Sequence, residues 1–144
     1  MNKKIIIAVA GIIIGIIAVV LLSGGGDEAL TPVKEPLPET LATVTLGGLE
    51  NGIAFVTDNN GVIEVQYGLV DAPEGVPQPA HIYAGTCEAL GELKYLLDPT
   101  IDGVSVTSLD ISAGELKKQL PLALAVNASL EEIGTYVACG NIAL

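Results

Sequence analysis

The sequence is poor in the residues on which most metal and redox sites depend. Among 144 residues there is one histidine, His81, and there are two cysteines, Cys87 and Cys139. A redox copper centre is held by several imidazoles, which a single histidine does not provide. The cysteines show no CxxC spacing, and with one histidine they are too few for a typical closed zinc site. The sequence therefore weighs against metal-based and redox catalysis.

Positive charge is scarce as well. All 17 acidic residues lie after residue 22, where they are accompanied by only four lysines, so this part of the chain carries a net charge of −13. A surface with this balance repels nucleic acid and anionic lipid headgroups. The three glycines at 24–26 lack the lysine that follows in a phosphate-binding loop. We therefore expect no nucleic-acid partner.

Hydrophobic residues are concentrated at 5–22 (IIIAVAGIIIGIIAVVLL), a run without any charge. As a helix rising about 1.5 Å per residue, this run spans roughly 27 Å, close to the ~30 Å hydrocarbon layer of a lipid bilayer. It predicts a single transmembrane anchor, with residues 1–4 as a cytoplasmic tip because Lys3 and Lys4 precede the span. A cleaved signal peptide is the alternative, although no A-x-A-like site follows Leu22. The protein is thus expected in the cell membrane, with its C-terminal part outside the cytoplasm.

After the span the composition changes twice. Residues 23–40 (SGGGDEALTPVKEPLPET) combine three glycines with three prolines, which is typical of an extended stalk. Residues 41–144 contain seven or eight short runs rich in β-branched residues, several of which alternate apolar with polar positions. The DNNG sequence at 58–61 separates two of these runs and is a strong hairpin signal. The pattern predicts an extracytoplasmic, antiparallel β-sandwich domain.

Two short segments of this domain have helical features. Ser112 and Glu115 have the spacing of a capping box at the start of residues 112–119, and residues 129–133 (SLEEI) are a second candidate. Neither segment is long enough to define the fold.

The two cysteines lie 52 residues apart in the domain expected on the outer side of the membrane. Extracytoplasmic compartments are commonly oxidising, and two cysteines there most simply pair with each other. In the chain-entropy model, a loop of this size contributes roughly 4 kcal/mol to stability. We therefore predict a structural disulfide between Cys87 and Cys139.

Two segments of the domain resemble a known family. PAHIYAGTC at 79–87 and TYVACGNI at 135–142 are similar to the copper/zinc superoxide dismutase-like β-sandwich, and more closely to small chordin-type (CHRD) domains. The resemblance covers about residues 41–144 and implies an immunoglobulin-like or dismutase-like Greek-key sandwich. In the dismutases the corresponding cysteines form a disulfide, which agrees with the pairing predicted above.

The metal ligands of that family are largely missing from this chain. His81 matches the first histidine of the family's H-x-H strand, but Tyr83 stands at the second position and Asn127 at that of the late histidine. The resemblance therefore implies a non-catalytic domain that binds a surface protein or glycan, or that serves the architecture of the cell envelope. The alternative is a copper- or zinc-binding, superoxide-related protein with a reduced site around His81.

Three further features suggest other roles. An apolar helix followed by a β-domain is similar to archaeal pilins, so a surface filament subunit is another hypothesis, although no Gly or Ala processing point follows Lys4. Gly11 and Gly15 form a GxxxG pair, which in a membrane helix favours a homo-oligomer. Asn127 begins an Asn-Ala-Ser glycosylation sequon.

Overall fold

The computed structural model describes residues 36–144. The predicted cytoplasmic tip, the membrane anchor and most of the predicted stalk lie outside this part of the chain, and with them the segment on which the filament hypothesis depends. Within residues 36–144, no helix is long and apolar enough to cross a membrane.

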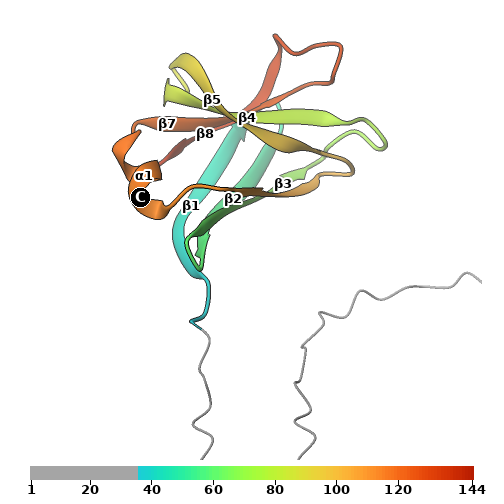
Figure 1. Ribbon diagram of the computed structural model, residues 1–144. Helices are drawn as coiled ribbons and strands as arrows, with labels where there is room; N and C mark the ends of the chain where they lie inside the picture. Colours follow the sequence, from blue (N-terminus) through green and yellow to red (C-terminus); the bar gives the residue numbers. More distant parts are fainter. Residues whose placement is uncertain (1–35) are drawn as a thin grey trace, which may run out of the picture. The chain divides into compact units, whose positions relative to one another are not determined.

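The described residues form eight strands and one short helix (Figure 1). Every strand pairing between neighbours is antiparallel, and the spatial order of the strands is β5-β4-β7-β8-β1-β2-β3-β6. The prediction of an all-β, antiparallel domain is therefore confirmed. The elements are β1 (Glu39–Gly48), β2 (Asn51–Asn59), β3 (Val62–Val70), β4 (Gln78–Thr86), β5 (Ala89–Thr100), β6 (Val104–Leu109), α1 (Ala113–Lys118), β7 (Leu122–Asn127) and β8 (Tyr136–Ile142).

The two layers expected for a sandwich are joined into a single sheet. One half consists of β1, β2, β3 and β6, the other of β4, β5, β7 and β8, and the halves meet where Gly47 and Gly48 of β1 pair with Cys139 and Ala138 of β8. Glycine is needed at this junction, because a Cβ on Gly48 would lie 2.5 Å from the carbonyl oxygen of Val137. The halves are thus continuous on one side, which a count of strands does not predict.

On the other side the sheet is nearly closed by side chains of β3 and β6. The Tyr67 hydroxyl and the Ser105 hydroxyl both donate to the carbonyl oxygen of Asp98 on β5, over 2.9 and 2.7 Å. The Asp98 amide donates to Oγ1 of Thr107 over 2.7 Å. These bonds replace part of a backbone ladder between β5 and β6 and draw the two outer strands together.

Tyr67 makes the hydrogen-bonded contact of β3 and β6 with β5 sensitive to alkaline pH. Burial, and to a smaller extent the charge of Asp98, raises the pKa of Tyr67 to about 12. A raised tyrosine pKa stabilises the fold fully below the unfolded-state value of about 10, and this contribution is lost as the pH rises towards 12. We expect Tyr67→Phe to cost about 1 kcal/mol at neutral pH and to reduce the loss of stability above pH ~10. Urea unfolding at several pH values measures both effects, and an unchanged alkaline slope would contradict this assignment.

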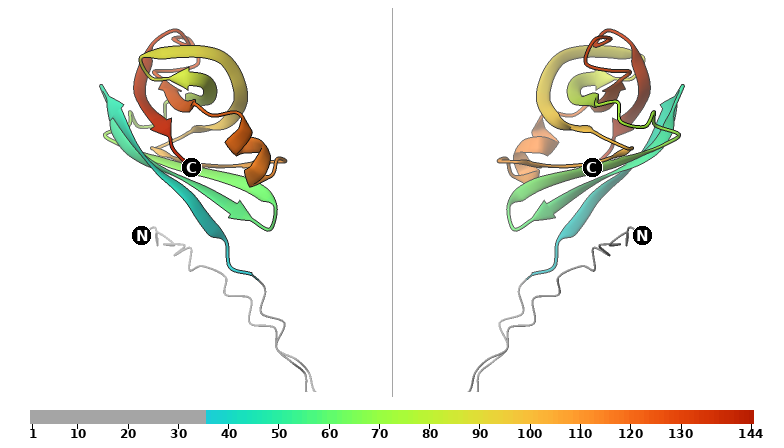
Figure 2. Two further views of the ribbon diagram at one scale, coloured as in Figure 1. Left: turned by 90° about the vertical axis from the view of Figure 1, so that its left-hand side faces the viewer. Right: turned by 90° about the vertical axis from the view of Figure 1, so that its right-hand side faces the viewer.

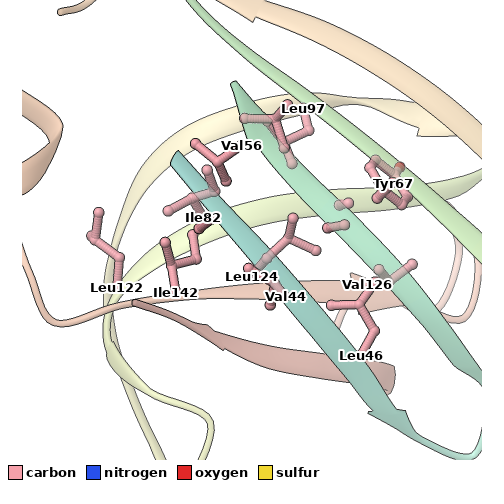
Figure 3. Packing of buried hydrophobic residues seen from close by; sticks show 14 of the residues in the cluster. Val44, Leu46, Val56, Tyr67, Ile82, Leu97, Leu122, Leu124, Val126 and Ile142 are labelled. Atoms are coloured by element: carbon pink, nitrogen blue, oxygen red, sulfur yellow. The ribbon is translucent and has the colours of Figure 1, made fainter. Parts of the chain in front are cut away.

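The interior between the two halves is filled by aliphatic side chains (Figure 3). They come from alternate positions of the strands, as the period of two requires. Burial of each such side chain contributes about 1.5–3 kcal/mol. Fully or almost fully buried members include Val44, Leu46, Val56, Ile82, Leu122, Leu124 and Val126. Leu116 of α1 is also fully buried, and the side views place α1 at one opening of the rolled sheet (Figure 2).

Two of the local structures predicted from the sequence are confirmed, and a third is not formed. The capping box is present, since Ser112 accepts from the Glu115 amide and the Glu115 carboxylate accepts from the Ser112 amide. The DNNG hairpin is present, with Asn60 and Gly61 at positive φ. The second helix candidate, residues 129–133, forms an irregular loop with bends instead, because the segment is short and Asn127 fixes its end at Ile133.

Candidate functional site

Part of the outer face of β2, β3 and β6, three strands of the half that also contains β1, is unexpectedly apolar. Ile53 and Phe55 of β2 and Val104 and Val106 of β6 point away from the core and are 37–59% exposed. Phe55 is the only phenylalanine in the chain. A group of large apolar side chains on one exposed face commonly marks an interaction site.

Strand β6 shows most clearly that this face is unusual. Its sequence VSVTSL alternates apolar with polar residues, so a half-buried strand is expected to turn its valines inward. The structure has the opposite orientation: Ser105 and Thr107 are buried, whereas Val104 and Val106 are exposed. The hydrogen bonds of Ser105 and Thr107 to Asp98 fix this register. The valines consequently remain in solvent.

A hollow of about 510 Å³ lies in this face, within the range of ligand-binding pockets. Its centre is Gly68 of β3, which stands between Ile53 and Val104 in the register. A Cβ on Gly68 would find its nearest neighbour, the Gly103 carbonyl oxygen, at 3.6 Å, so the backbone here has room for a side chain. The hollow exists because residue 68 has none. It is lined by Asn51, Gly52, Ile53, Gly68, Leu69, Val70, Gly103 and Val104.

The sequence-predicted candidate His81 lies elsewhere, on the outer face of the other half. Its ring is in edge contact with Tyr83, two residues along β4, at a centroid distance of 5.9 Å. Tyr83 in turn contacts Tyr136 of β8, with 6.0 Å between centroids and 3.4 Å between hydroxyls. Burial, followed by the hydrogen bond with Tyr136, raises the pKa of Tyr83 to about 12, so this phenol is neutral at physiological pH.

This aromatic row packs over the middle of the sheet. Strand β7 lies between β4 and β8, and its Ala123 and Ala125 are fully buried although they face outward. Their small side chains leave room for the rings of Tyr83 and Tyr136 to meet across β7. Among the described residues, no three or more His, Cys, Asp or Glu side chains gather in a group suited to a metal. Copper or zinc at His81, the alternative hypothesis, stays untested.

The two cysteines are brought together as predicted. Cys87 is in the turn between β4 and β5, Cys139 is in β8, and their Cα atoms are 5.9 Å apart in a disulfide. The Cys87 amide also donates to Oδ1 of Asn141 over 2.8 Å. The hairpin tip of β4 and β5 is therefore tied to β8 by a covalent bond and a hydrogen bond.

Asn127, the residue of the glycosylation sequon, is fully buried. Its Nδ2 donates to the carbonyl oxygen of Ile133, and the Ala128 amide donates to Thr135. Asn127 thus anchors the loop between β7 and β8. A glycan on Nδ2 would displace this contact, so we expect the folded domain to carry none there.

Sequence reasoning missed the hollow, and only one residue signals it in the sequence. The valines of β6 alternate correctly for a strand, but only the partners of Ser105 and Thr107 determine which way they face. Gly68 interrupts an otherwise regular strand, which can indicate close approach of another backbone or ligand. No protein-family model matches the chain, and neither a curated protein nor a solved structure is significantly similar to it.

Proposed function

We propose that the protein is a membrane-anchored, non-catalytic extracytoplasmic binding domain, and that it holds another protein at the hollow of β2, β3 and β6. The observation that carries this proposal is the orientation of β6, which leaves Val104 and Val106 in solvent on the face that also exposes Ile53 and Phe55 of β2. The hollow offers few polar groups to hydroxyl-rich glycans. An apolar side chain of a protein partner fits it better.

The dismutase-like or chordin-like relationship belongs to the same proposal. Strand β7 lies beside β4, and β6 lies beside β3, so the chain returns to earlier strands by crossover connections. Such returns are the feature of a Greek key. Together with the paired cysteines, they support the resemblance of residues 79–87 and 135–142 to that family.

Photo-crosslinking in the native cell tests the binding role. A photoreactive amino acid replaces Val104 in the hollow, or Leu96 on the outer face of β5 as a matched control. Both residues are exposed aliphatic side chains in strands, at 59% and 66%. We expect a discrete, reproducible adduct with one protein from position 104 and none of that mass from position 96.

A second variant shows whether the hollow itself is responsible. Gly68→Val fills its centre while placing a residue of higher β-propensity in β3, so the fold is expected to persist. The adduct from position 104 should then disappear at an unchanged protein level. Equal adducts from positions 104 and 96, or an adduct unaffected by Gly68→Val, would overturn the proposal.

A further inference from the structure

The hollow has a charged end. Strand β3 leaves it at Val70 and is followed by Asp71, and β6 enters it at Val104 after Asp102 and Gly103. Both aspartates are exposed and have left-handed backbone angles, with φ of 63° and 57°. Because β3 and β6 are antiparallel neighbours, these two residues lie at the same end of the hollow.

A third carboxylate belongs to this end. Oδ1 of Asp102 accepts a hydrogen bond from the Gly75 amide over 2.9 Å, and a Cβ on Gly103 would lie 3.4 Å from Cβ of Ala72. The loop after β3 is therefore packed beside the turn before β6. It brings the exposed residue Glu74 to the same end as Asp71 and Asp102.

Compensating positive charge is absent from this end within residues 36–144. The three lysines of that range are Lys94 on β5 and Lys117 and Lys118 on α1. Lys94 is paired with Glu92 at 2.9 Å, and α1 follows the opposite end of β6. Glu50 is half-buried, unlike the three exposed carboxylates, and its Oε1 accepts from Nε2 of Gln78 over 2.9 Å, so we do not count it with them.

We infer that the partner at this hollow is a protein segment that combines an apolar side chain with adjacent lysine or arginine residues. This inference rests on the proposed function and adds the chemistry of the partner. The apolar side chain enters the hollow over Gly68, and the cations face Asp71, Glu74 and Asp102. A second copy of this chain would bring its own carboxylates to the contact and is disfavoured by repulsion.

Selection from a displayed random-peptide library on the full-length protein in mild detergent tests the inference. We expect enriched peptides to carry an aromatic or aliphatic residue with lysine or arginine within a few positions. Their binding should be lost with Gly68→Val and kept with Ser108→Val. The control also introduces a valine on the outer face of the sheet, but on β6 and away from the hollow. The double variant Asp71→Asn/Asp102→Asn should weaken binding roughly 3- to 10-fold at low salt, and this difference should shrink at high salt.

The outcomes separate the two proposals. Enrichment of neutral or acidic apolar peptides that still require an open Gly68 would overturn the inference about charge and leave the binding role standing. Peptides that bind wild-type protein and Gly68→Val equally would overturn both. Concentration-dependent dimerisation abolished by Gly68→Val would show that a second copy occupies the hollow, and would also overturn the inference.

Discussion

Replacement of both Cys87 and Cys139 by alanine is expected to lower the free energy of unfolding by about 4 kcal/mol. The bond closes a loop with a sequence separation of 52 residues and joins the β4–β5 hairpin to the last strand. Without it, the unfolded chain gains the freedom that the closed loop removes. Because small domains are stable by only about 5–15 kcal/mol, this is a large fraction of the total.

Chemical denaturation of the full-length protein in its oxidised, reduced and double-alanine forms measures this contribution. The reduced protein and the double variant should unfold at similar denaturant concentrations, well below that of the oxidised protein. Agreement between them shows that the effect comes from the covalent bond and not from the new side chains. A difference below about 1 kcal/mol between oxidised and double-alanine forms would refute a structural role for the disulfide.

The second large effect is expected at Gly140, where β8 passes closely over β1. A Cβ on this residue would lie 2.5 Å from the Thr45 carbonyl oxygen and 2.6 Å from Cγ1 of Val44. Backbone cannot move aside as a flexible side chain would, so Gly140→Ala must push β8 away from β1. Overpacking of this kind costs about 3 kcal/mol.

Gly134→Ala is the matched control for this substitution. Gly134 lies just before β8, and a Cβ there would have no heavy atom within 4 Å. Its replacement should change the free energy of unfolding by less than about 0.5 kcal/mol. Similar destabilisation of the two alanine variants in urea would show that general glycine replacement, and not the approach to β1, causes the loss.

Much of the fold was predictable because its signals are local. Strand β3 is an example, since VIEVQYGLV is rich in β-branched residues and directly follows the DNNG turn signal. The capping box of α1 and the Asn60-Gly61 turn depend on residues only a few positions apart. Strand β1 begins at Glu39, within residues 23–40, because Glu39 and Thr40 pair with β2 although they follow several prolines.

What the sequence did not predict depends on contacts between distant strands. The direction in which Val104 and Val106 face follows from Ser105 and Thr107 reaching Asp98, which no local pattern indicates. The single continuous sheet likewise follows from the pairing of Gly47 with Cys139. For the candidate site, attention was drawn to His81 as the only histidine, whereas the hollow depends on a missing side chain at Gly68.

Phe55 offers the most direct measurement of the central claim, that the outer face of β2, β3 and β6 is covered by a partner. A fluorophenylalanine encoded at position 55 alone gives one ¹⁹F signal from this face, in purified protein and in membranes that contain other proteins, and it replaces the only phenylalanine of the chain. Its broadening by a soluble paramagnetic agent reports solvent exposure. We predict strong broadening in the purified full-length protein, weak broadening in native membranes, and strong broadening again in membranes carrying Gly68→Val. Equal broadening of the wild-type signal in both preparations would contradict the account.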